Sequence, residues 1–359
     1  MRKCVAIVYN EPQSSRYDNN HEEKAVLGVL EAVTAVHQAL IELEHEVTLL
    51  PLIPPFEEAR KKLAALSVDV VFNLFEGFCG EPETEALVPE TLTELGITYT
   101  GCRASIIQLA LDKAKVKVIL KDAGIPSPDF QLINPQTLNT FRLEYPCIVK
   151  PRGEDASHGI SADSLVTDFP SLERQVRAIS ESYNSGALVE RFIGGREFNA
   201  TVMGNSRCVV LPVSEIVYSL SPEVPRILTF AAKWEPDSTY FKGTKVICPA
   251  EVSAQERRYI AHTALAAFRL LVGSGYARMD MRMNEAGKLN VIEVNPNPDI
   301  SPGTGAARQS SAAGMGYSEF IETIVSLAVE REEYDRQNPP DVRKRQAGVD
   351  TDTEEYARI

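Results

Sequence analysis

The sequence predicts an α/β protein that begins with a helix-covered parallel sheet and continues into a larger, strand-rich region. Two observations support this class. Short apolar runs alternate with helical segments through about the first 100 residues, and this order favours a parallel sheet, because parallel strands need crossover connections. Residues 187–300 are then rich in strand patterns, interrupted by a long polar segment at 218–244.

The N-terminal elements follow one another closely. The strands are short and apolar, the helices carry apolar residues at helical spacing, and Gly96 closes the last helix. The predicted strands are 4–9, 46–52, 68–74 and 97–101. The predicted helices are 21–45, 55–66 and 84–96.

The later elements include longer helices. The predicted helices are 104–124, 253–272 and 317–332, and around residues 145–160 the pattern turns to strands and a glycine-bearing loop. The first of these helices runs without a break to Gly124, which supplies its stop. From about residue 331 the chain is charged and contains Pro339–Pro340, so we expect a mobile tail there.

Composition restricts the class of protein. The chain has 359 residues, of which 44% are hydrophobic and 24% charged, as in ordinary globular proteins. Its net charge of −13 argues against a nucleic-acid partner, because phosphate backbones bind basic surfaces. No apolar run reaches the length of a membrane span. The six cysteines are scattered without a CxxC pair, so we expect reduced thiols in a cytoplasmic protein that binds a small molecule and no zinc.

Two strand-like stretches late in the strand-rich region form a predicted hairpin that carries oxygen ligands. Alternation in ARMDMRM puts Asp280 on one face with Arg278 and Arg282. A two-residue loop would place Asp280 opposite Glu293, whereas a three-residue loop with a bulge would shift the register by one. Opposed carboxylates are destabilising unless a cation lies between them. With the Asn295 oxygen they suit Mg²⁺, although an exposed polar face explains the hairpin equally well.

A second stretch has the composition of a phosphate-binding loop. Lys150 ends a strand, and the small residues Gly153, Ser157 and Gly159 follow. Small side chains let backbone N–H groups approach a phosphate, and the lysine adds positive charge. Neither a Walker A loop nor GxGxxG is present, and a plain turn is the commoner explanation of such a stretch taken alone.

Four motifs occur in order along the chain: IVKP before a glycine-bearing loop, VERFIGGREFN, AAKW, and RMD followed by EVNPNP. Together they resemble the ATP-grasp superfamily, most closely the D-alanine–D-alanine ligases, over about residues 70–330. The resemblance implies an ATP-grasp fold with a Rossmann-like domain at 1–110, a small central lid domain at 111–187, a catalytic domain at 188–330 and a tail at 331–359. It implies ATP-dependent joining of a carboxylate to an amine through an acyl phosphate, with release of ADP. Homodimers would fit this family.

The resemblance also assigns roles to individual residues. It assigns ATP binding to Lys113, Lys150, Ser157, Glu190, Ile193, Glu197 and Lys233. Among these, Lys113 and Lys150 would contact the phosphates and Lys233 the γ-phosphate, Glu190 and Ile193 the adenine, and Glu197 the ribose. It assigns Mg²⁺, or Mn²⁺ in its place, to Asp280, Glu293 and Asn295. Arg278 and Lys233 would be catalytic, because positive charge offsets the repulsion between the reacting oxygens.

The sequence departs from the family where an amino acid would bind. The family's N-terminal GGxSxE-like loop is absent, and Glu22 or Glu23 would have to replace its glutamate. Glu76 stands where the family has a histidine. The N-terminal side of the amino-acid pocket is therefore expected to differ.

Further departures follow on the C-terminal side. Ala156 and Trp234 stand at a serine and a tyrosine of the family, so the hydrogen bond between those two side chains cannot form. The family's substrate-carboxylate serine aligns with Thr304, or with Ser301 across a gap. We expect retained nucleotide chemistry beside an altered amino-acid pocket that contains Glu76, Trp234, Ser301 and Thr304.

Three alternatives to this ligase remain open. A true D-alanine–D-alanine ligase of peptidoglycan synthesis would have to accept D-alanine in the altered pocket. A nucleotide-binding protein without turnover would be expected to have lost some of the lysines or Arg278. A dinucleotide oxidoreductase would rest on the N-terminal βαβα order alone, which lacks the glycine fingerprint. In the ligase, segment 218–244 is predicted to be a lid, because it is long and polar and carries Lys233.

Overall fold

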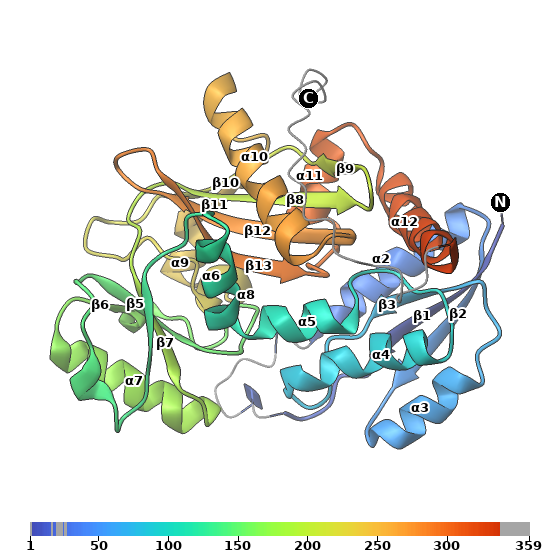
Figure 1. The fold of residues 1–359 in the computed structure, drawn as a ribbon, viewed down its shortest axis with the longest axis horizontal. Helices are drawn as coiled ribbons and strands as arrows, with labels where there is room; N and C mark the ends of the chain where they lie inside the picture. Colours follow the sequence, from blue (N-terminus) through green and yellow to red (C-terminus); the bar gives the residue numbers. More distant parts are fainter. Residues whose placement is uncertain (1, 16, 19–23, 25–26, 338–359) are drawn as a thin grey trace.

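The computed structural model describes residues 2–15, 17–18, 24 and 27–337. Within these ranges the strands form sheets of three, four and six strands. Figure 1 shows the three-stranded sheet at the right, in blue, the four-stranded sheet at the lower left, in green, and the orange strands of the six-stranded sheet above them.

The N-terminal sheet has the order β2–β1–β3 with both pairs parallel, which confirms the predicted parallel sheet. Its strands are β1 (Cys4–Asn10), β2 (Glu46–Leu52) and β3 (Val70–Leu74). The helices around it are α2 (Val29–Glu42), α3 (Phe56–Ala64), η2 (Pro82–Ala86), α4 (Leu87–Glu94) and α12 (Tyr317–Gln337). Val5 and Ile7 belong to the apolar cluster of α2 and α12, whereas Ala6 and Val8 belong to that of α3 and α4. Helices therefore cover both faces of the sheet.

The strand predicted at 97–101 is reduced to one bridge, between Val71 and Tyr99. Only two backbone hydrogen bonds form there, from Val71 N–H to Thr98 and from Thr100 N–H to Val71. The chain then turns at Gly101, whose φ of +85° favours glycine. The turn ends the pairing before a strand develops.

The single helix predicted over 104–124 is two helices, α5 (Ala104–Leu111) and α6 (Lys113–Asp122). Asp112 separates them because its side chain caps α6, accepting a hydrogen bond from Lys115 N–H at 3.1 Å. Arg152 also binds both carboxylate oxygens of Asp112, at 3.3 and 2.6 Å. The break makes Lys113 the first residue of α6.

The central sheet has the order β4–β7–β5–β6, and its pairs are antiparallel. Its strands are β4 (Phe130–Ile133), β5 (Cys147–Pro151), β6 (Leu165–Val166) and β7 (Ala187–Arg191). Apolar side chains of α7 (Phe169–Tyr183) pack against it. The glycine-bearing loop follows β5, as the sequence predicts.

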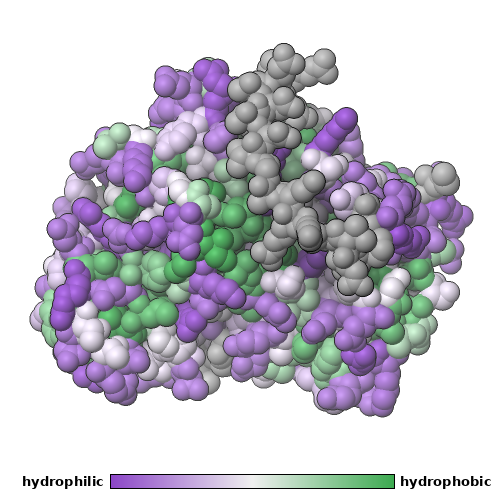
Figure 2. All heavy atoms as spheres, in the orientation of Figure 1, coloured by the Kyte–Doolittle hydropathy of each residue, from purple (hydrophilic) through white to green (hydrophobic). Residues whose placement is uncertain are grey.

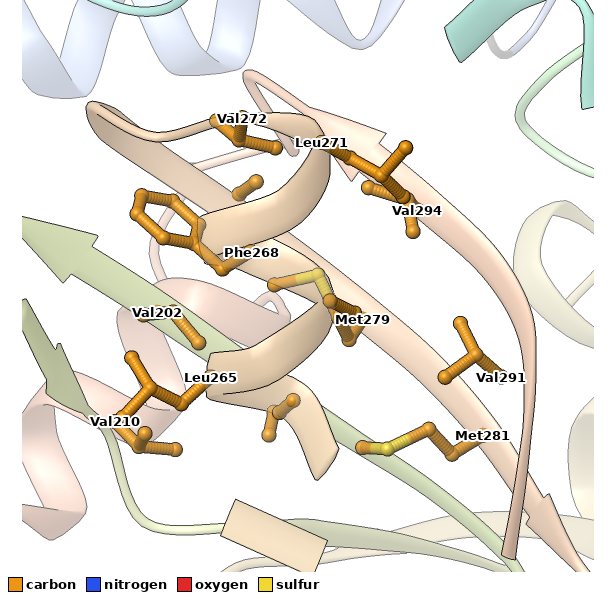
Figure 3. Packing of buried hydrophobic residues seen from close by; sticks show 14 of the residues in the cluster. Val202, Val210, Leu265, Phe268, Leu271, Val272, Met279, Met281, Val291 and Val294 are labelled. Atoms are coloured by element: carbon orange, nitrogen blue, oxygen red, sulfur yellow. The ribbon is translucent and has the colours of Figure 1, made fainter. Parts of the chain in front are cut away.

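The largest sheet has the order β11–β10–β8–β12–β13, with β9 paired to β8. Its strands are β8 (Glu197–Gly204), β9 (Cys208–Val210), β10 (Ser214–Tyr218), β11 (Thr244–Ile247), β12 (Gly275–Met283) and β13 (Leu289–Pro296). The helices α8 (Phe230–Trp234) and α9 (Thr239–Gly243) lie between β10 and β11 in the chain, and α11 (Gly305–Ala312) follows β13. Helix α10 (Ala254–Leu271) packs on the sheet. Figure 3 shows its side chains Leu265, Phe268 and Leu271 beside Val202, Met279, Met281, Val291 and Val294.

Helix α12 extends beyond its predicted end at residue 332 to Gln337, the last described residue. Arg331 is buried and donates hydrogen bonds to the carbonyl oxygens of Gly101 and Tyr99, and Asp335 is ion-paired to Arg103. The expectation of a mobile tail was therefore wrong for residues 331–337, because these contacts hold the last turns of the helix. The rest of the predicted tail, 338–359, and part of the predicted start of α2 lie outside the described residues.

Figure 2 shows polar side chains over most of one face of the molecule, with smaller apolar patches near its middle. None of the helices in the described residues is long and apolar enough to cross a membrane. All six cysteines are free thiols.

Candidate active site

A cleft gathers residues from the central sheet, the loop after β5, α6, α8 and the hairpin of β12 and β13. Nine of the residues predicted to bind ATP or metal line it. They are Lys113, Lys150, Ser157, Glu190, Ile193, Glu197, Lys233, Asp280 and Glu293. The fold thus brings into one cavity positions that are far apart in the sequence.

Asp280 and Glu293 are direct partners across β12 and β13. The loop between the strands has three residues, since Asn284 N–H donates to the Lys288 carbonyl and Met283 pairs with Leu289. A register shift next to Asp280 then moves the pairing by one residue. The predicted pairing of Asp280 with Glu293 is confirmed, but the two-residue loop from which it was predicted was wrong.

Two cations of the protein neutralise these carboxylates. Arg278 binds Asp280 through Nε at 2.7 Å and through a terminal nitrogen at 2.8 Å, and Lys113 Nζ lies 3.1 Å from Glu293 Oε1. Burial opposes ionisation of Glu293, but Lys113, Lys150 and Lys233 outweigh it and lower its pKa to about 2. The repulsion between opposed carboxylates is thus relieved without a metal, so it does not by itself require one.

The oxygen atoms nevertheless fit a hard divalent cation. Asp280 and Glu293 both line the cleft, and the Asn295 amide nitrogen donates to Asp280 Oδ2 at 3.0 Å, which places its amide beside the carboxylates. Carboxylate and amide oxygens are ligands that Mg²⁺ accepts, together with phosphate and water. The described residues contain no cluster of three or more histidine, cysteine or acidic side chains that would form a different metal site.

A buried trio of charges includes two residues of the cleft, Glu190 and Lys150. Glu190 has Lys117 Nζ at 3.2 Å from one carboxylate oxygen and Lys150 Nζ at 3.3 Å from the other. The side chains of Glu190 and Lys117 are only 2% and 3% exposed. Burial opposes ionisation of Glu190, yet the two lysines lower its pKa. Lys117 was not predicted as a site residue, although it lies four residues after Lys113 on one helical face.

Glu197 and Arg282 also line the cleft. The Tyr218 hydroxyl donates to Glu197 Oε2 at 2.7 Å, and an Arg282 nitrogen lies 3.5 Å from the same oxygen. The guanidinium of Arg282 also stacks 4.7 Å from the ring centre of Phe192. Arg282 lines the cleft and was not predicted as a site residue, although its alternation places it on the face of Asp280.

Segment 218–244 packs on the loop after β5. The Ser157 hydroxyl donates to the Leu228 carbonyl at 3.1 Å, and Trp234 Nε1 donates to the Ala156 carbonyl at 3.4 Å. The family's serine–tyrosine side-chain hydrogen bond, which Ala156 and Trp234 cannot form, is therefore replaced by a hydrogen bond from the Trp234 side chain to the Ala156 backbone. Lys233 lines the cleft, and burial together with Arg278 lowers its pKa.

The four residues predicted for the amino-acid pocket lie outside the set that lines this cleft: Glu76, Trp234, Ser301 and Thr304. The Thr304 hydroxyl donates to the Ser301 carbonyl at 2.7 Å, and Ser301 N–H donates to Asp299. Surrounding protein and the charges of Asp299 and Asp155 raise the pKa of Glu76 to about 8, although exposure of this residue lets solvent screen part of the effect.

Arg278 connects the cleft with the loop that carries Ser301 and Thr304. A Cβ atom on Gly305 would lie 3.4 Å from Arg278 Cδ, so the first turn of α11 packs against this arginine. The other residues predicted for the amino-acid side, Glu22 or Glu23, lie outside the described residues.

Comparisons with known proteins agree with this arrangement. Residues 119–326 match the family model for the D-ala D-ala ligase C-terminus. An uncharacterized protein of Sinorhizobium fredii, y4sG, is 33% identical over 266 residues, covering 73% of this chain and 75% of that protein. A D-alanine–D-alanine ligase of the same species is 33% identical over 271 residues, covering 74% of this chain and 82% of the ligase.

The fold is similar to that of a D-alanine–D-alanine ligase from Bacillus anthracis, with a TM-score of 0.72 and 20% identity, covering 93% of this chain and 100% of that one. The four-stranded and six-stranded sheets that form the cleft therefore belong to an ATP-grasp fold. Because the family model spans more than half of the chain, the chain belongs to the D-alanine–D-alanine ligase family of ATP-grasp enzymes, ADP-forming ligases that make C–N bonds.

Proposed function

We propose that this ligase phosphorylates a carboxylate with Mg²⁺–ATP and joins the resulting acyl phosphate to an amine, with an amino-acid pocket that differs from that of D-alanine–D-alanine ligases. One observation carries the proposal. Lys113, Lys150 and Lys233 line the same cleft as Asp280 and Glu293. Three cations around two carboxylates fit a site that binds a phosphate chain together with a metal.

The nucleotide would extend from the trio around Glu190 to the hairpin. Glu190 and the Ile193 backbone are proposed to bind the adenine, and Glu197 the ribose hydroxyls. Tyr218 and Arg282 hold the Glu197 carboxylate in one orientation, which favours directional hydrogen bonds to a sugar. Lys113, Lys150 and Ser157 would then face the phosphates, with Lys233 at the γ-phosphate.

Asp280, Glu293 and Asn295 are proposed to hold Mg²⁺ or Mn²⁺. When bound, the cation withdraws negative charge from the phosphate oxygens. Arg278 would then exchange part of its contact with Asp280 for the acyl phosphate and the tetrahedral intermediate. Its guanidinium lies between the metal ligands and the Ser301 loop, which is where those anionic oxygens are expected.

The altered pocket is proposed from the residues that replace family side chains. Trp234 is larger than the family's tyrosine and binds the Ala156 backbone, which changes the space beside the loop. Glu76 replaces a histidine and adds an acid where an amino group would be recognised. Thr304 and Ser301 are proposed to meet the substrate carboxylate.

Turnover of Mg²⁺–ATP with paired pools of carboxylates and amines tests this proposal, read by ADP release and product mass. We expect ADP only when both classes are present, and a product mass equal to donor plus acceptor less water. ADP formation with D-alanine alone, giving its dipeptide, would instead show a true D-alanine–D-alanine ligase. No ADP from any pool, with cell extract added as a further source of donor, would overturn the proposed turnover.

A further inference from the structure

An aromatic column links the N-terminal segment to the loop after β5 and to α8. The ring of Tyr17, from the segment after β1, stacks on the His158 imidazole with centroids 3.9 Å apart and planes within 9°. His158 packs against Phe230 at 5.6 Å, and Phe230 against Trp234 at 6.2 Å. Three stretches of chain that are distant in sequence therefore meet in one column.

A buried hydrogen bond holds Tyr17 in this column. Its hydroxyl donates to Glu154 Oε2 at 2.7 Å, and Tyr17 and Glu154 are 6% and 8% exposed. Hydrogen bonds to a carboxylate are stronger than those between neutral groups. The carbonyl oxygen of Glu154 accepts a hydrogen bond from Lys113 Nζ. Tyr17 thus binds the residue that also orients a lysine of the cleft.

The other end of the column reaches a second lysine. Lys233 directly precedes Trp234 on α8, and this helix is bound to the loop after β5 near both ends. Phe230 N–H donates to the Ile160 carbonyl at 3.0 Å, and Trp234 Nε1 to the Ala156 carbonyl. Tyr17 packs on the same loop, so it restrains the element that connects Lys113 with Lys233.

We propose that Tyr17 is a positioning residue for the ligase: through Glu154 and His158 it holds the loop after β5 and, with it, Lys113 and the Lys233 helix in one arrangement. The inference rests on the proposed function, since it takes these lysines as the groups that face ATP. Tyr17 is not among the residues that line the cleft. It acts by restricting the loop, in which Ala156 and Ser157 have left-handed φ values of +52° and +65°.

Fluorescence of the single tryptophan tests the restraint without any turnover. Trp234 is the only tryptophan in the chain, so acrylamide quenching of its emission reports on the far end of the column. In the full chain without nucleotide, Tyr17→Leu is expected to raise the quenching constant roughly two-fold, because the loop opens locally more often. Tyr17→Phe keeps the ring and should quench nearly as the parent does. Tyr334→Leu, on an exposed tyrosine of α12, serves as the matched control and should leave quenching unchanged.

Turnover with a substrate pair identified by the assay proposed above tests the consequence. Tyr17→Leu should lower kcat about 100-fold with a smaller change in the KM for ATP, because misplaced lysines affect the transition state most. Tyr17→Phe should lower kcat about tenfold through loss of the bond to Glu154. Unchanged kcat in both variants would overturn the proposal.

A lower thermal midpoint with parental quenching and kcat would make Tyr17 merely structural and would also overturn it. If Tyr17→Leu does not fold, a Tyr17→Phe variant with the kcat of the parent would also overturn the proposal. If the parent turns over no substrate pair, the proposed function fails, whereas the quenching comparison still decides whether Tyr17 restrains the column.

Discussion

Asp280 and Glu293 lie directly opposite each other on β12 and β13, yet a different cation of the protein binds each carboxylate. Arg278 occupies both oxygens of Asp280, and Lys113 lies beside Glu293. In the proposed function these same cations face phosphate oxygens when Mg²⁺–ATP is bound. Binding would therefore exchange partners within one set of charges rather than bring unpaired charges into the cleft.

Asp280→Asn and Glu293→Gln are each expected to lower ADP release by at least about 100-fold, because each removes a proposed metal ligand. The thermal midpoint should also fall, because each change takes a carboxylate from Arg278 or Lys113, but unfolding should stay cooperative, since amides keep the size of both side chains. The measurement is ADP release over a Mg²⁺ titration beside a melting curve. Glu333→Gln, on an exposed acid of α12, is the control. Near-normal ADP release from either site variant would disprove the metal assignment.

The register of this hairpin shows what the sequence could and could not predict. Alternation placed Asp280, Glu293 and Asn295 on one face, because side-chain direction on a strand depends on local spacing alone. The three-residue loop and the register shift that compensates for it depend on packing against neighbouring strands. The correct pairing of Asp280 with Glu293 therefore followed from two offsetting local deviations that the sequence did not reveal.

Other differences also arise from long-range contacts. Arg152 binds Asp112, and this pair accompanies the break between α5 and α6 within a segment of continuous helical spacing. Arg331 reaches the carbonyl of Tyr99, so α12 continues where charged composition predicted a tail. The role of Lys117 could not be predicted from the sequence, because it depends on the ion pair with Glu190, which only the fold brings together. Motif order along the sequence was sufficient for the family, and nine of the residues that it predicted line the cleft.

Lys117→Met is expected to lower the free energy of unfolding by about 3 kcal/mol at pH 7, because it removes one of the two cations on the buried Glu190. The pKa of Glu190 is lowered in the folded chain, so its carboxylate stabilises the fold above the unfolded value of 4.5 and loses this effect as pH falls through the lowered pKa. The difference between parent and variant should therefore shrink towards acidic pH.

Urea unfolding at pH 7 and at pH 4 measures this difference. Lys115→Met, on the exposed face of the same helix, controls for the loss of a lysine from α6. If Lys117→Met and Lys115→Met had equal effects at pH 7, the pair of Lys117 with Glu190 would contribute no net stability.

Arg282→Met is expected to raise the KM for ATP about tenfold and to leave kcat within about threefold, because Arg282 orients Glu197 and stacks on Phe192, which belong to the part of the cleft proposed to bind the nucleoside. Arg282→Lys keeps the charge but loses the planar stacking on Phe192, so its KM for ATP should lie between those of the parent and Arg282→Met. Steady-state kinetics with ATP varied measure both constants, with Arg269→Met on α10 as an exposed control. A fall in kcat at unchanged KM would instead indicate that Arg282 stabilises the transition state.

The pKa of Glu76, raised to about 8, predicts a pH dependence on the amino-acid side of the reaction. Below its raised pKa the carboxyl is protonated and neutral, and above it the carboxylate attracts an ammonium group. If Glu76 binds the amino group of the donor, the KM for that donor should fall as pH rises through this pKa, which solvent screening places between the usual 4.5 and 8, and Glu76→Gln should abolish this step. Deprotonation of the attacking amine also accelerates the reaction with pH, but that step persists in Glu76→Gln and can be subtracted. The measurement is the KM for the donor from pH 6.5 to 9 in the parent, in Glu76→Gln and in the exposed control Glu83→Gln. Identical pH profiles in all three proteins would exclude Glu76 from donor binding.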